Sequence, residues 1–282
     1  MRLNPFDTSK IDVRGGGGGG GMRAGGVGCG AIVIALIGAL VFGIDPMDTL
    51  STVEGMQGGQ ATQESSDMTE QQLCSQNQYA SETCSVLGSL NETWAGVFQE
   101  QNVQGFNTPS LTFIQGGGVR TACGAASSAM GPFYCPADEG IYIDTRFYDQ
   151  LAQMSGDRGD FARLYVIAHE YGHHIQKITG IADAIRSAQQ QNPRAANQLQ
   201  VRMELQADCY AGVWAGRNRN RIDPGDVEEG MRAASAIGDD TLTQGRVSAE
   251  NFTHGTSQQR MQALELGMRG DDRQCDAITQ IR

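Results

Sequence analysis

Three of the chain's four histidines lie within one short segment, HEYGHH, which runs from His169 to His174. His169 and His173 are four residues apart, so on a helix both imidazoles face the same side and can bind one metal ion. Glu170 stands one position further round, where its carboxylate can reach a water on that ion without binding the ion. This HExxH pattern predicts a zinc site in which Glu170 acts as a base.

Two histidines do not complete such a site, because a catalytic zinc ion usually has three protein ligands and one open position. His174 lies about 140° around the helix from His169, which makes it a poor third ligand. We interpret His174 as a structural residue or as one that supports a ligand. HExxH is also short enough to occur by chance on a helix surface, so the missing ligand must come from elsewhere.

The segment ELQAD, residues 204–208, offers an acidic ligand. Glu204 and Asp208 are four residues apart and share one helix face. Glu204 would complete a site of two histidines and one glutamate, and Asp208 would accept the second N–H of a ligand histidine. The alternative is a solvated pair of carboxylates, which the apolar neighbours of Glu204 make less favourable.

The remaining histidine, His254, lies in the segment NFTHGTSQQR, and Arg260 follows it six residues later. Close to a metal, His254 could donate a hydrogen bond to the oxyanion of a tetrahedral intermediate. On the sequence alone, a histidine in a surface loop is the simpler interpretation.

Hydrophobic periodicity places these motifs on regular elements. Helices are expected at 81–101, 160–180, 193–217, 223–238 and 257–270, and strands at 111–115 and twice within 133–144. The first motif lies on the helix at 160–180 and the second on the helix at 193–217. The order of a helix, a small sheet and several further helices predicts a mostly helical α+β domain.

The N-terminal third has a different character. Residues 1–26 are polar and then glycine-rich, and we interpret them as a cytoplasmic tail. Residues 24–44 carry no charge and predict a transmembrane helix at 27–44. Basic residues before this helix and acidic residues after it predict an N-terminus in the cytoplasm and a periplasmic or otherwise extracytoplasmic C-terminal part. A cleaved signal peptide, a lipoprotein signal at Cys29 and a buried core helix fit less well.

Residues 45–72 are expected to form a flexible linker, and residues 73–282 the folded domain. This domain region holds an even set of cysteines without a CxxC pair, which fits three disulfides in an oxidising compartment. Spacing favours the pairs Cys74–Cys84, Cys123–Cys135 and Cys209–Cys275, although other pairings and free buried thiols remain alternatives. The net charge of −11 argues against a nucleic-acid partner.

The motifs HEYGHHIQ, ELQAD and THGTSQQR follow a glycine-rich N-terminus and a single apolar segment. In this combination the chain resembles the bacterial neutral zinc metallopeptidase family over nearly its whole length. It is more remotely similar to the gluzincins, including the membrane-associated zinc proteases of the heat-shock and CAAX-processing kind. The resemblance implies a zincin-like domain that binds one zinc ion.

The resemblance also implies a role for each residue of the motifs. His169, His173 and Glu204 would be the zinc ligands, Glu170 the base, and Asp208 the partner of a ligand histidine. His254 and Arg260 match an HPxxxxR segment of the remote relatives, although Gly255 replaces the proline. This match implies an oxyanion contact for His254 and an ion pair with a buried acid for Arg260.

The zincin resemblance implies that an edge strand pairs with an extended substrate, and GIYID, residues 140–144, is the candidate. Together these features predict a membrane-anchored zinc endopeptidase that acts on a peptide or protein. The alternatives are a zincin-fold scaffold protein without turnover and a zinc amidase that acts on cell-wall peptides. The presence of Glu170 favours an enzyme over a scaffold.

Overall fold

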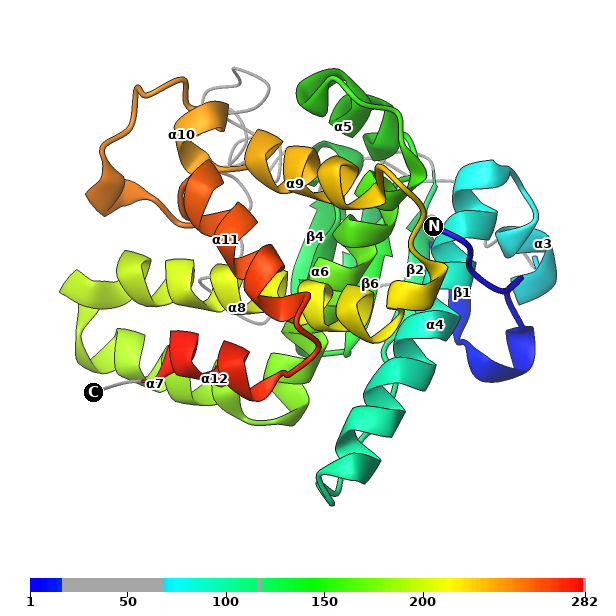
Figure 1. Cartoon of the computed structure of the whole chain (residues 1–282), viewed down its shortest axis with the longest axis horizontal. Helices are drawn as coiled ribbons and strands as arrows, with labels where there is room; N and C mark the ends of the chain where they lie inside the picture. The colour runs from blue at the N-terminus through cyan, green and yellow to red at the C-terminus, as the bar shows by residue number, and fades with distance from the viewer. Residues whose placement is uncertain (17–67, 116–117, 281–282) are drawn as a thin grey trace.

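The computed structural model describes residues 1–16, 68–115 and 118–280, and this part is mostly helical with a small sheet, as expected (Figure 1). The longer helices are α4 (Gln78–Glu100), α6 (Asp160–Ile178), α7 (Ile181–Gln191), α8 (Ala196–Arg217), α9 (Asp226–Ala236) and α11 (Ser257–Gly267). The shorter helices are α3 (Glu70–Cys74), α5 (Phe147–Ser155), α10 (Asp239–Leu242) and α12 (Arg273–Thr279). The strands are β1 (Val13–Gly16), β2 (Ser110–Ile114), β3 (Gly118–Thr121), β4 (Gly124–Ser127), β5 (Phe133–Cys135) and β6 (Gly140–Ile143).

The main sheet has four strands in the order β1–β2–β6–β5. Strands β1, β2 and β6 run parallel, and β5 runs antiparallel to β6. Strands β3 and β4 form a separate hairpin. The two inner strands, β2 and β6, are buried along their whole length, which explains why SLTFI and GIYI are largely apolar rather than strictly alternating.

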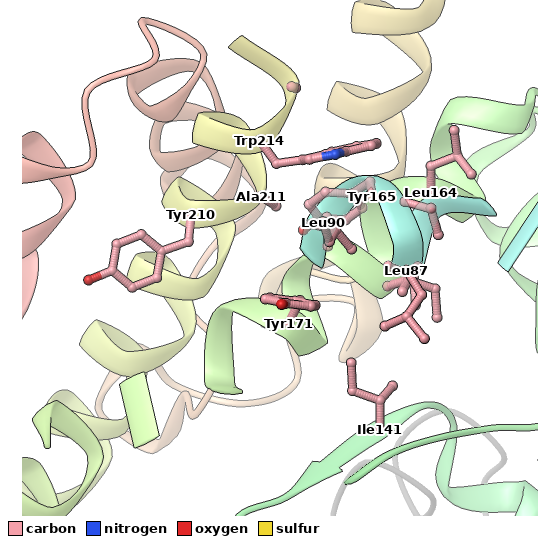
Figure 2. Close-up of a cluster of buried hydrophobic side chains, with 14 of the residues drawn as sticks. Leu87, Leu90, Ile141, Leu164, Tyr165, Tyr171, Tyr210, Ala211 and Trp214 are labelled. Atoms are coloured by element: carbon pink, nitrogen blue, oxygen red, sulfur yellow. The ribbon is translucent and has the colours of Figure 1, made fainter. Parts of the chain in front are cut away.

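Helix α6 lies in the middle of the domain and packs against α4, α8 and α9 (Figure 1). Figure 2 shows part of the surrounding core, to which α4 contributes Leu87 and Leu90, α6 Tyr165 and Tyr171, α8 Ala211 and Trp214, and β6 Ile141. Because α6 is covered on several sides, its polar side chains need partners inside the protein.

Two glycines allow unusually close contacts with α8. A Cβ atom on Gly172 of α6 would lie 2.9 Å from both the Cα and the carbonyl oxygen of Ala207. A Cβ atom on Gly267 of α11 would lie 1.8 Å from the carbonyl oxygen of Cys209. Because glycine has no side chain, α6 and α11 can both approach α8 closely at these two positions. This approach lets side chains from all three helices meet.

Three disulfides join segments of the domain. Cys74–Cys84 links α3 to α4, Cys123–Cys135 links the β3–β4 turn to β5, and Cys209–Cys275 links α8 to α12. These are the three pairs that the spacing favoured, so the expected pairing is confirmed. The third disulfide fixes the C-terminal helix on the surface of α8.

Residues 1–16 are part of the folded domain, which differs from the cytoplasmic tail expected for residues 1–26. Strand β1 pairs with β2, and the N–H of Val13 donates to Oε1 of Glu70 in α3 at 3.2 Å. Met1, Ile11 and Val13 belong to the hydrophobic core. A short parallel strand has only distant partners, so composition and periodicity do not reveal it. Helix α3 also begins before the expected domain boundary at residue 73.

The expected transmembrane helix at 27–44 and most of the linker at 45–72 lie outside the described residues. Of the helices within the described ranges, none combines the length and the apolar character needed to cross a membrane. Strand β1 precedes this segment and α3 follows it, and the two elements contact each other. A single membrane crossing between them would place them on opposite sides. We therefore expect residues 1–16 and the rest of the domain to lie on the same side of any membrane.

Cysteine labelling tests this expectation. In a Cys29→Ser background, the exposed residues Ser9 and Ser187 are replaced one at a time by cysteine. Both should react with a membrane-impermeant maleimide from the same side, in intact cells or in inverted vesicles, because β1 and α7 belong to one folded unit. Ser89→Cys serves as a control that should stay unlabelled, since this position is buried. Labelling of Ser9→Cys and Ser187→Cys from opposite sides would contradict the pairing of β1 with β2.

Candidate metal centre

His169 and His173 lie on the same face of α6, as their spacing requires. Their ring centroids are 4.9 Å apart, and the rings are nearly perpendicular, at 87°. The side chain of His169 is 8% exposed and that of His173 is 18% exposed. The pair is therefore held inside the domain, and His173 is the more accessible member.

Glu204 of α8 faces both histidines. Its Oε2 lies 3.2 Å from Nε2 of His169 and 3.6 Å from Nε2 of His173. Ligand atoms that bind zinc tetrahedrally at about 2.0–2.2 Å lie about 3.4 Å from one another. The separations observed fit one such ion, and the donor set of two imidazoles and one carboxylate is typical of catalytic zinc. The structure thus brings together the three side chains expected as ligands.

The electrostatics of the centre favour a positive charge. Burial opposes the charged form of His169, but the carboxylates of Asp208 and Glu204 outweigh it and raise the pKa of His169 to about 10. Burial also opposes the ionisation of Glu204, yet the charge of His173 and hydrogen bonds from both histidines hold its pKa well below the usual range. A metal cation between these side chains would likewise be stabilised by the carboxylate of Glu204.

Asp208 contacts the other ring nitrogen of His169, with its Oδ1 2.7 Å from Nδ1. Arg260 of α11 donates to both oxygens of Asp208, from Nε at 2.8 Å and from Nη2 at 2.9 Å. Tyr165 of α6 donates its hydroxyl to Oδ1 at 2.5 Å. Burial opposes the ionisation of Asp208, but Arg260 and His169 hold its pKa at about 2. The ionised carboxylate keeps a proton on Nδ1 and leaves Nε2 free for a metal.

Several residues that contact the candidate ligands were not predicted from the sequence. Tyr165 gave no signal, because it occupies an apolar position of α6. Gln200 donates from Nε2 to Oε1 of Glu204 at 2.9 Å, and Oε1 of Gln176 lies 2.9 Å from Nδ1 of His173. Each glutamine stands about one helical turn from the ligand that it contacts. This spacing is the signal that could have identified them.

Glu170 is buried, at 8% exposed, and it follows the candidate ligand His169 in α6. It does not belong to the converging ligand group of the described residues. Burial raises the pKa of Glu170, although the charges of His169 and His173 oppose this shift. A carboxylate held beside the ligands, but outside their group, is suited to proton transfer.

His254 lies in the loop before α11 and stands outside the ligand group. Its Nδ1 is 3.1 Å from Oδ1 of Asp239. The Oδ2 of Asp239 accepts the backbone N–H groups of Thr253, His254 and Gly255 at 2.8, 2.7 and 3.0 Å. This buried carboxylate fixes the loop and contacts Nδ1 of His254 rather than Nε2. The sequence offers no reason to select Asp239, because it lies in a short acidic stretch that is typical of the start of a helix.

Two expectations near the centre have clear outcomes. His174 points away from the ligands: its Nε2 donates to the carbonyl of Asn107 at 2.8 Å, and its Nδ1 lies 3.1 Å from the hydroxyl of Tyr134. The segment expected to bind substrate, residues 140–144, contains β6, which pairs with β2 on one side and β5 on the other. The prediction that it forms an edge was wrong. The edge strand that contacts α6 is β5.

A second group of carboxylates, Asp160, Asp226 and Glu229, lies at the starts of α6 and α9. The amino nitrogen of Met1 is 3.0 Å from Oδ1 of Asp160 and 3.0 Å from Oδ2 of Asp226. These acids therefore face a positive charge from the chain itself, and the histidine-containing group is the better candidate for a metal.

The chain is similar to known proteins along most of its length. A family model described as "Putative neutral zinc metallopeptidase" matches residues 5–278. The chain is 41% identical over 270 residues to the uncharacterized protein YpfJ of Escherichia coli K12. The matched region covers 93% of this chain and 90% of that protein. It is 40% identical over 192 residues to the uncharacterized protein Rv2575 of Mycobacterium tuberculosis H37Rv, which covers 62% of this chain and 64% of that protein. No solved structure matches the chain.

Proposed function

This chain belongs to the neutral zinc metallopeptidase family, and from that premise we propose that it is a zinc-dependent endopeptidase that acts on peptides or proteins. The observation that carries the proposal is the convergence of His169, His173 and Glu204 from two helices, with Glu170 buried beside them. Ligands from separate helices are harder to explain by chance than a single HExxH segment.

His169, His173 and Glu204 would hold the zinc ion, which when bound polarises the scissile carbonyl and lowers the pKa of the attacking water. Glu170 accepts a proton from this water and passes it to the nitrogen of the leaving amine. Nδ1 of His254 faces the carboxylate of Asp239, so Nε2 would donate a hydrogen bond to the oxyanion on the carbonyl oxygen from the doubly protonated ring.

The activity test uses the full chain rather than a fragment that begins at Leu73, because such a fragment would lack β1 and the start of α3. The purified protein is loaded with zinc and incubated with a mixed peptide library, and mass spectrometry identifies the products. We expect internal cleavage that stops on chelation and returns with zinc. Zinc binding without any cleavage would instead favour a protein that keeps the site without turnover.

Removal of the third ligand tests the metal centre itself. Glu204→Ala should lower the zinc content from about one ion per chain to nearly none, because two imidazoles alone bind zinc weakly. The zinc content is measured by elemental analysis after dialysis. Glu265→Ala in α11 is the control. Glu265 is exposed, and it belongs neither to the histidine-containing group nor to the second group of carboxylates. Full zinc occupancy in Glu204→Ala would refute the assignment of the third ligand.

A further inference from the structure

Two buried glutamines connect the ligand His173 to the C-terminal helix α12. We infer that Gln176 and Gln206 form a hydrogen-bond relay that places the proton of His173 on Nδ1 and so presents Nε2 to the metal. This inference rests on the proposed zinc site and assigns both glutamines as positioning residues for it.

The relay begins at groups whose hydrogen-bonding roles are fixed. Nε2 of Gln206 in α8 donates to the carbonyl oxygen of Cys275 at 3.3 Å and to Oγ1 of Thr279 at 2.9 Å. A backbone carbonyl can only accept, so the amide nitrogen of Gln206 must face α12. Its Oε1 is consequently directed the other way, towards Gln176 of α6.

The same reasoning fixes the second amide. Nε2 of Gln176 donates to the carbonyl oxygen of Met203 at 2.7 Å and to Oε1 of Gln206 at 3.0 Å. Both partners are acceptors, so this nitrogen cannot exchange places with the amide oxygen. The remaining atom, Oε1 of Gln176, lies 2.9 Å from Nδ1 of His173. An amide oxygen only accepts, and Nδ1 must therefore carry the proton.

Burial keeps the relay in this orientation. Gln176 and Gln206 are both 0% exposed, so water cannot replace a lost partner. Rotating either amide would place oxygen against oxygen and leave buried donors unpaired, which is unfavourable inside a protein. The far end is also held firmly, because the Cys209–Cys275 disulfide joins α12 to α8.

The two ligand histidines are thus oriented by different chemistry. The Nδ1 of His169 faces the charged carboxylate of Asp208, whereas the Nδ1 of His173 faces a neutral amide. In both cases an oxygen atom, of Asp208 or of Gln176, accepts a hydrogen bond from Nδ1. Nε2 of each ring then lies on the side of Glu204. A neutral partner can fix the ring without adding another negative charge to the centre.

The test replaces each glutamine by methionine, which nearly conserves volume and removes the amide. Gln176→Met should weaken zinc binding by about 10- to 100-fold, as loss of such an outer partner typically does. Gln206→Met should weaken it less, because Gln176 keeps its bond to Met203. Zinc affinity is measured by competition with a chromogenic chelator, and thermal unfolding of the zinc-free proteins is recorded in parallel.

Asn91→Leu is the matched control. Asn91 is a buried amide that donates to the carbonyl of Lys10 and accepts from the hydroxyl of Tyr171, and it contacts no ligand. We expect this variant to lower thermal stability and to leave zinc affinity unchanged. Equal zinc affinity in Gln176→Met and wild type would overturn the relay, and so would an equal loss of zinc affinity in Asn91→Leu.

A spectroscopic measurement reports on the proton directly. The chain has four histidines, so NMR of protein labelled with ¹⁵N-histidine can resolve each ring. In the zinc-loaded wild type we expect His173 to bind through Nε2 and to carry its proton on Nδ1. Binding of zinc through Nδ1 of His173 would contradict the inference and would leave the peptidase proposal unaffected. A wild type that binds no zinc would instead refute the proposed function.

Discussion

Glu170→Gln should retain about one zinc ion per chain and lose peptide hydrolysis by about 10²- to 10⁴-fold. The amide is nearly the same size as the carboxylate, so the fold and the ligand positions should be kept. It cannot, however, take a proton from water and return it to the leaving amine. Zinc content and the rate of cleavage of a peptide substrate are measured on the same preparation.

The contrast with Glu204→Ala makes this result specific. Both variants should be inactive, but only Glu204→Ala should lose zinc, because Glu170 stands outside the ligand group. The two losses therefore separate proton transfer from metal binding. Wild-type turnover in Glu170→Gln would rule out Glu170 as the base.

Asp208→Asn should lower the free energy of unfolding by about 3–5 kcal/mol, which is typical when one member of a buried ion pair is removed. The side chain of Arg260 is 3% exposed and would keep its charge without an ionised partner. The acceptor for Nδ1 of His169 would also be weakened, so zinc should bind less tightly. Denaturant unfolding of the zinc-free protein gives the stability, and chelator competition gives the zinc affinity.

Glu92→Ala provides the comparison for this variant. Glu92 and Lys10 form an ion pair in which both side chains are about half exposed, so its loss should change stability little. If Asp208→Asn unfolds at the same denaturant concentration as wild type, the buried pair does not stabilise the domain. The structure gives no reason to expect that outcome.

The effect of Asp208→Asn should also depend on pH in one direction. Arg260 and His169 lower the pKa of Asp208 in the folded protein to about 2, below the value of about 3.9 for an unfolded aspartate. Its contribution to stability is therefore fully present above about pH 4 and is lost as the pH falls towards 2. The difference between wild type and Asp208→Asn should shrink over that range. A difference that grows in acid would contradict the assignment.

The N-terminal residues show where local patterns fail. Residues 1–16 are polar and end in glycine, which is typical of a tether, yet they contain β1 and bury Met1, Ile11 and Val13. Strand β1 pairs with the edge of β2, and that edge is built from residues far along the chain. No window around residues 13–16 contains this information. For the same reason, the position of β6 inside the sheet could not be read from its own residues.

The sequence by itself determined what depends on neighbours along one helix. Fixed helical geometry placed His169 with His173 and Glu204 with Asp208, and it set His174 aside. Only the tertiary structure decided how those faces meet. Gly172 lets α6 approach Ala207 of α8, which brings Glu204 to the histidines. Gly267 lets α11 approach α8, which brings Arg260 to Asp208. The contact of Tyr165 with Asp208 and that of Gln206 with Gln176 became visible only at that level, because a hydrogen bond between helices depends on their distance in space rather than on the spacing along either one.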